Sequence, residues 1–200
     1  EKSGYNPVSM YGRSKVEMEE KIHAIAKSDD SIKIIRPPAV YGPREDQIFT
    51  YFKTFSKGLS TIIGNGNHPP VSMVYVSDLV NGILKSSKKL DTGIHTYFIT
   101  GPQPNTWNQI HNVTATVMGK KAFKLKIKPS LVLKVGSAIE NMASLIGKYP
   151  VVNKEKAKEL VLEWTCSSDK AEQELGYKAN VTIQEGISRT IHWYKKHNWL

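Results

Sequence analysis

Cysteine is nearly absent from this sequence of 200 residues, which contains only Cys166. A single thiol excludes an internal disulfide and favours a reducing compartment, so we expect a cytoplasmic protein. Long apolar runs are also missing: no stretch approaches the roughly 18 residues of a membrane-spanning helix, and we predict no integral membrane segment. Histidine and cysteine do not cluster at the spacings that metal ligands need, so we predict no metal site.

The composition is that of a globular protein, with 40% hydrophobic and 23% charged residues. The net charge of +10 would attract anions of many kinds. However, the lysines are scattered over the chain instead of alternating with stacking aromatic residues, and no nucleic-acid-binding motif occurs. We therefore predict a small-molecule substrate and no nucleic acid partner.

Helical and strand patterns alternate along the first hundred residues. Apolar periodicity, β-branched runs and turn residues predict helices over 9–27, 48–57 and 79–86, and strands over 32–35, 60–63, 71–76 and 95–99. The first helix has an apolar stripe that includes Met10 and Ile25. Ser77 and Asp78 are positioned to cap the helix that begins at 79. Alternation of this kind is typical of the α/β class.

The second hundred residues are mostly helical. Capping-box pairs mark two helix starts, Thr106 with Gln109 and Thr182 with Glu185. Lysines alternate with apolar residues over 123–128, which predicts a strand with one buried apolar face and one charged face. Further helices are predicted over 130–147, 168–175 and 183–197, the second of them ending at Gly176.

Tyr11 and Lys15 could form an acid-base pair. Residues four apart share one face of a helix, and a lysine cation favours the tyrosinate form of a neighbouring phenol. With nine tyrosines in a lysine-rich chain, about one Tyr-x-x-x-Lys match is expected by chance. The pair alone therefore does not identify a function.

An ordered series of motifs places the pair in a wider context. The segments are 9–15 (SMYGRSK), 34–44 (IIRPPAVYGPR), 74–79 (VYVSDL), 97–101 (YFITG), 169–177 (DKAEQELGY), 185–187 (EGI) and 193–194 (WY). This series resembles the C-terminal half of the extended short-chain dehydrogenase/reductases, the NAD-dependent epimerase/dehydratase family. The resemblance covers essentially the whole chain and is nearest to dihydroflavonol reductase-like and 3-beta-hydroxysteroid dehydrogenase-like members.

The resemblance implies roles for particular residues. Tyr11 would be the general acid-base residue, and Lys15 would hold the ribose of a nicotinamide cofactor, either NAD or NADP. The segment Pro37, Pro38, Ala39 and Val40 would pass beside the cofactor, largely through its backbone. In the family, a glycine-rich loop and a catalytic Ser or Thr precede this segment, so we expect the 200 residues to be inactive on their own.

The resemblance leaves the reaction open among three alternatives. Nucleotide-sugar epimerases of the family often have an asparagine at the position of Ala39 and an arginine near Val71, and this sequence has neither. That difference favours an oxidoreductase that interconverts a secondary alcohol and a ketone. A nucleotide-sugar epimerase or dehydratase is the second alternative, and a non-catalytic dinucleotide-binding sensor or interaction protein is the third.

The expected architecture is the C-terminal part of a doubly wound Rossmann domain plus a small, mostly helical substrate-binding region. We place the remainder of the NAD(P)-binding domain in residues 1–100, with a substrate-side insertion at about 45–75. Residues 101–200 would form the substrate-covering region. Family members commonly pair through the helix that bears the Tyr and Lys, which implies a homodimer.

Overall fold

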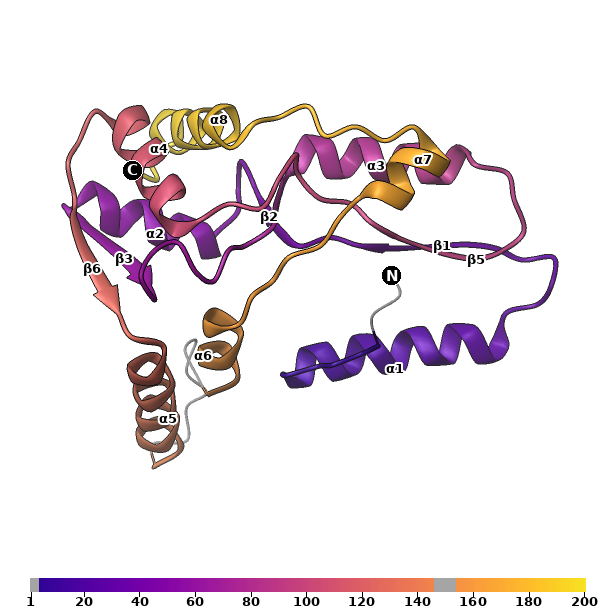
Figure 1. The fold of residues 1–200 in the computed structure, drawn as a ribbon, viewed down its shortest axis with the longest axis horizontal. Helices are drawn as coiled ribbons and strands as arrows, with labels where there is room; N and C mark the ends of the chain where they lie inside the picture. Colours follow the sequence, from indigo (N-terminus) through magenta and orange to yellow (C-terminus); the bar gives the residue numbers. More distant parts are fainter. Residues whose placement is uncertain (1–3, 146–153) are drawn as a thin grey trace.

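The computed structural model describes residues 4–145 and 154–200 of the chain. Its described part contains six strands: β1 (Ser31–Arg36), β2 (Ala39–Tyr41), β3 (Leu59–Ile63), β4 (Met73–Tyr75), β5 (Gly93–Phe98) and β6 (Phe123–Ile127). It also contains eight helices: α1 (Met10–Ile25), α2 (Gln47–Ser56), α3 (Val76–Lys88), α4 (Trp107–Met118), α5 (Pro129–Leu145), α6 (Lys154–Val161), α7 (Asp169–Leu175) and α8 (Ile183–Lys196). Figure 1 shows their arrangement.

All six strands pair in parallel. β1 pairs with β5, β2 with β4, and β3 with β6, in three two-stranded sheets. Parallel partners cannot be joined by a tight turn, so each pair is separated in sequence by a crossover that contains a helix. Ser31, for example, pairs with Gly93, and Leu59 pairs with Phe123. The predicted α/β class is confirmed.

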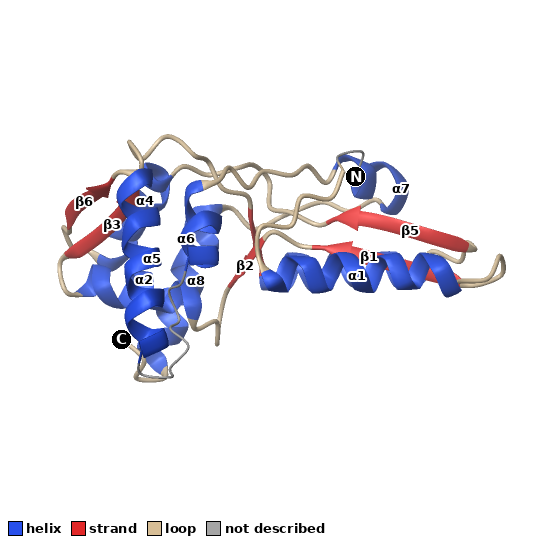
Figure 2. Cartoon of the chain, turned by 90° about the horizontal axis from the view of Figure 1, so that it is seen from below, coloured by secondary structure: helices blue, strands red, loops and turns tan. Residues whose placement is uncertain are grey.

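Helices cover both faces of the β1–β5 pair. α1 lies on one side of these strands, and α3 and α7 lie on the other (Figures 1 and 2). Tyr97 of β5 and Ile99 just beyond it are fully buried, and Tyr177, which follows α7, packs with them in one core cluster. This three-layer arrangement is that of a Rossmann domain.

A second core joins elements from both halves of the chain. It contains Phe52 and Phe55 of α2, Ile110 of α4, and Ile191 and Tyr194 of α8, all buried. α4 packs against α8, and α2 packs on β3. Residues before and after position 100 therefore share this core, and the division into domains at that position stays a prediction.

Several helix ends lie where their local signals predicted. Ser9 caps α1 by accepting a hydrogen bond from the Gly12 amide, and Thr106 with Gln109 forms a complete capping box at α4. Thr182 accepts from the Glu185 amide at the start of α8. α7 ends at Gly176, whose φ of 61° lies in the left-handed region that glycine tolerates without strain.

The predicted capping role of Ser77 and Asp78 is wrong. α3 begins at Val76 and its N-cap is Tyr75, so both residues lie inside the helix. The carboxylate of buried Asp78 instead accepts hydrogen bonds from the backbone amides of Asn180 and Val181, at 3.1 and 2.9 Å. Asp78, which the sequence pattern indicated as a helix cap, thus binds a segment about one hundred residues away in the chain.

The prediction that the strand over 123–128 buries its apolar face is also wrong. On β6, Phe123 is 71% exposed and Leu125 is exposed as well, while Lys124 is partly covered and approaches Asn112 of α4. The physical reason is that α2 and α4 pack on the side of the β3–β6 pair that carries Ser60. Ser60 pairs with Lys124, so the helices cover the face of Lys124 and leave the opposite face, with Phe123 and Leu125, exposed. On α1, Met10 and Ile25 are exposed, and the one buried residue is Glu19.

Two elements were not predicted, β2 and α6. β2 has three residues and directly follows two prolines, so its sequence resembles a loop. α6 is short and strongly charged, with no apolar periodicity to mark it. The predicted end of the helix over 130–147 lies outside the described residues.

Candidate active site

Tyr11 and Lys15 lie one turn apart on α1, as their spacing predicted. The Ser9 cap fixes the start of this helix two residues before Tyr11. Tyr11 is 71% exposed, and the ammonium nitrogen of Lys15 lies 5.2 Å from the centroid of its ring. The lysine cation thus lies over the face of the tyrosine ring.

A polar cluster fixes α1 on the end of β1. Glu19 lies one turn beyond Lys15 and accepts hydrogen bonds from Arg36, the last residue of β1. The bond from Arg36 Nε is 3.0 Å long, and Arg36 Nη2 makes a second, very short contact. The Tyr5 hydroxyl donates to Glu19 and accepts from Arg36, both at 3.0 Å. Because Glu19 is the one buried residue of α1, this cluster helps to place Tyr11 and Lys15 relative to the strands.

The cluster shifts the ionisation of its members in the directions that a buried ion pair predicts. Burial alone would raise the pKa of Glu19, but hydrogen bonds from Arg36 and Tyr5 outweigh it and the pKa is lowered. The hydrogen bond to Glu19 raises the pKa of Arg36, against the effect of burial. Both groups are therefore charged at neutral pH, and their ion pair joins α1 to the end of β1.

Pro37, Pro38, Ala39 and Val40 follow directly after Arg36. Pro37 and Ala39 are exposed, whereas Pro38 and Val40 are partly covered. Ala39 and Val40 belong to β2, and Val40 packs against the core cluster around Tyr97. The structure thus links the two predicted parts of the site through Arg36 and Glu19.

The position of the site suits a ligand of an open parallel sheet. α1 starts on the side of the molecule where β1 and β5 end (Figures 1 and 2). Ligands of such sheets bind beyond the carboxyl ends of the strands. Tyr11 and Lys15 are both exposed at the start of that helix.

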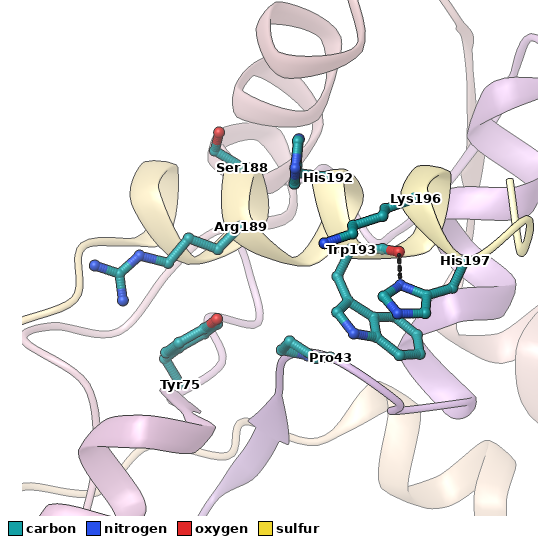
Figure 3. Close-up of a pocket in the computed structure, with 8 residues that line it drawn as sticks. All are labelled: Pro43, Tyr75, Ser188, Arg189, His192, Trp193, Lys196 and His197. Atoms are coloured by element: carbon teal, nitrogen blue, oxygen red, sulfur yellow. Dashed lines mark hydrogen bonds between the residues drawn. The ribbon is translucent and has the colours of Figure 1, made fainter.

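A pocket of about 580 Å³ lies elsewhere, beside α8. Its lining consists of Pro43, Tyr75, Ser188, Arg189, His192, Trp193, Lys196 and His197. Figure 3 shows these residues around α8. Arg189 forms an ion pair with Glu185, a residue of the same helix. Neither Tyr11 nor Lys15 lines it. We therefore do not regard this pocket as the catalytic centre.

Within residues 4–145 and 154–200, His, Cys, Asp and Glu form no group of three or more that could hold a metal ion. Over the same residues, no helix combines the length and the apolar character that a membrane crossing requires.

Sequence reasoning missed Glu19 and Glu155 as parts of this region. Glu19 follows Lys15 by one helical turn, a spacing that could have indicated a shared face. Glu155 contacts the first turn of α1 from α6, and nothing in its local sequence signals that contact.

The chain is similar to known proteins of one family. The model of the NAD dependent epimerase/dehydratase family matches residues 1–100. Uncharacterized protein y4nL of Sinorhizobium fredii is 31% identical over 98% of the chain and 57% of its own length. Ceramide reductase of Caulobacter vibrioides is 26% identical over 96% of the chain and 59% of its own length. The chain therefore spans less than two thirds of these relatives.

A solved structure shows the same fold. UDP-glucuronic acid 4-epimerase from Bacillus cereus, in complex with NAD, superposes with a TM-score of 0.71 at 23% identity. The alignment covers 98% of this chain and 58% of that one. The predicted Rossmann-type fold is confirmed.

Proposed function

Because the chain belongs to the NAD dependent epimerase/dehydratase family, we propose that the protein is an NAD(P)-dependent oxidoreductase that interconverts a secondary alcohol and a ketone. The observation that carries this proposal is the Lys15 ammonium 5.2 Å from the Tyr11 ring, on an exposed helix start near the carboxyl ends of parallel strands. The residues proposed to contact the cofactor are Tyr11, Lys15 and the segment 37–40.

The chemistry divides between the protein and its cofactor. A nicotinamide, when bound, supplies or accepts the hydride. The Tyr11 hydroxyl would exchange a proton with the substrate oxygen, as a general acid in reduction and a general base in oxidation. Lys15 would bind the cofactor ribose through its ammonium group.

The substrate-side residues favour a substrate with little charge. The side chain of Ala39 carries no amide group. The backbone of Val71 forms β-bridges with Asn105 and Trp164. Neither residue can pair with a diphosphate through its side chain. The name of the similar ceramide reductase agrees with an alcohol–ketone reaction.

An epimerase is the second candidate, favoured by the fold shared with UDP-glucuronic acid 4-epimerase. Such an enzyme uses the same Tyr and Lys but regenerates its cofactor in each turnover. Net consumption of the cofactor separates the two reactions. A non-catalytic dinucleotide-binding protein would bind the cofactor and turn over nothing.

The test uses the intact protein that contains this chain. Ceramide, a 3β-hydroxysteroid and UDP-glucose are supplied with NAD⁺ or NADP⁺, and the reduced nicotinamide is followed by its absorbance. We expect net reduction with one of the first two alcohols. Tyr11→Phe should then lose at least about 100-fold in kcat, the usual contribution of a general acid-base group.

The matched control is Lys21→Met, which removes a charge from an exposed position on the same helix. Lys15→Met should impair both cofactor binding and turnover, whereas Lys21→Met should behave like the wild type. Full activity in Tyr11→Phe would refute the assigned chemistry. Conversion of UDP-glucose without net reduction would establish the epimerase instead.

Three further expectations belong to this proposal. We propose a homodimer in which α1 lies at the interface, which light scattering of the purified protein would test. The choice between NAD and NADP is decided by the assay above. The cytoplasmic location stays a prediction that rests on the single cysteine.

A further inference from the structure

α6 lies beside the first turn of α1, although the two helices are far apart in sequence (Figures 1 and 2). Glu155, in the first turn of α6, makes the contact. One of its carboxylate oxygens accepts a hydrogen bond from the Met10 backbone amide at 2.9 Å. The other accepts from Arg13 Nη2 at 3.1 Å.

The contact meets a need of the catalytic helix. The first amides of a helix have no partner within it, and its N-terminus carries partial positive charge. Ser9 satisfies the amide of Gly12 but not that of Met10, and the first turn of α1 contains no acidic residue. Glu155 therefore supplies, from another helix, the carboxylate that the first turn of α1 lacks.

Both partners of Glu155 flank Tyr11 in the chain. Met10 immediately precedes it and Arg13 follows two residues later, so the contact holds the turn that carries the proposed acid-base group. α6 is also fixed at its other end: the Trp164 indole donates to the Glu159 carbonyl, and the Ser72 amide donates to the Trp164 carbonyl. α6 also packs against α5.

We propose that Glu155 is a positioning residue, which docks the substrate-covering helices α5 and α6 against the start of the catalytic helix. This inference rests on the proposed function, because it assumes that Tyr11 is the reacting group. An exposed ion pair alone contributes little. Here the same carboxylate also binds a backbone amide at a helix N-terminus, which gives the contact a defined geometry.

The contact itself is tested by amide hydrogen exchange over the first turn of α1, in the intact protein. Glu155→Ala should speed exchange of the Met10 amide about fivefold, the change expected when a helix loses one capping bond. Glu155→Gln should have a smaller effect, because its carbonyl oxygen can still accept from Met10. The matched control is Glu20→Gln, an exposed position of α1, which should leave that amide unchanged.

The positioning role is tested by kinetics with the alcohol that proves active in the panel above. Glu155→Ala should raise the KM for that alcohol several-fold and leave the KM for the nicotinamide cofactor unchanged. Arg13→Gln should show part of the effect, and adding it to Glu155→Ala should do little more, since both remove one interaction. A general loss of stability would lower the amount of active enzyme, and so the apparent kcat, while both KM values stayed unchanged.

The outcomes distinguish the two claims. If Glu155→Ala exchanges and turns over like Glu20→Gln, the positioning role is wrong, whatever Tyr11 does. Faster exchange with both KM values unchanged would also overturn it, because the contact would then be structural alone. If Tyr11→Phe keeps full activity, the proposed function fails, while the exchange result still reports on the contact.

Discussion

Removing the charge of Glu19 should release α1 from the strands. Glu19 is the one buried residue of the helix, and it binds Arg36 and Tyr5 through its carboxylate. Breaking a fully buried ion pair costs about 3–5 kcal/mol. The side chain of Arg36 is 21% exposed and can regain water, so we expect about 2 kcal/mol for Glu19→Gln, or about 30-fold in the opening equilibrium of α1.

The loss should be local because α1 has few other contacts. Amide exchange along α1 should therefore accelerate while β1 and β5 keep their protection. The folded-state pKa of Glu19 is lowered, so its stabilisation is present above the ordinary glutamate pKa and is lost as the pH falls through the lowered value. The difference between wild type and Glu19→Gln should accordingly shrink below about pH 4.

Exchange measured at neutral pH on wild type, Glu19→Gln and Glu20→Gln decides the matter. Glu20 is exposed on the same helix, so its substitution removes the same charge without the buried contact. Equal exchange in the two variants would show that the cluster does not hold α1 and would refute the argument.

Two further predictions concern the core around α8 and α4. Gly186→Ala should destabilise the protein by about 1–3 kcal/mol in urea unfolding, because a Cβ there would overlap the hydroxyl of buried Tyr41. The control Ser188→Ala, on the exposed face of α8, should leave the stability unchanged. Burial, aided by the charge of Lys124, lowers the pKa of His111, so folding should weaken as the pH falls through about 6.5. His111→Gln should show a smaller loss of urea midpoint between pH 7.5 and 5.5, and an unchanged loss would contradict that assignment.

Local signals predicted the elements well, because caps and turns act within a few residues. Thr106 with Gln109 and the glycine at 176 marked helix ends that the structure confirms. The alternation over 123–128 predicted a strand correctly but assigned the wrong face to the core. Which face is covered depends on where α2 and α4 pack, and a strand's own pattern does not contain that information.

The spacing of Tyr11 and Lys15 predicted their proximity, since one helix carries both. The contacts that place this helix were not predictable in the same way. Arg36 reaches Glu19 from a strand, and Glu155 reaches Met10 from the other half of the chain. Long-range contacts between charged residues leave no periodic trace in a sequence.

The parallel pairing of the six strands in residues 4–145 and 154–200 has a consequence for how the chain acquires its structure. The two strands of a hairpin are adjacent in sequence and can pair as soon as both are synthesised. β1 can pair only after β5 has been synthesised, and β3 only after β6. The helices between them can form early, but they bury little until those distant partners meet. During synthesis, β1 and the exposed start of α1 therefore precede the segments that fix them, and this interval is when they are most open to wrong pairing.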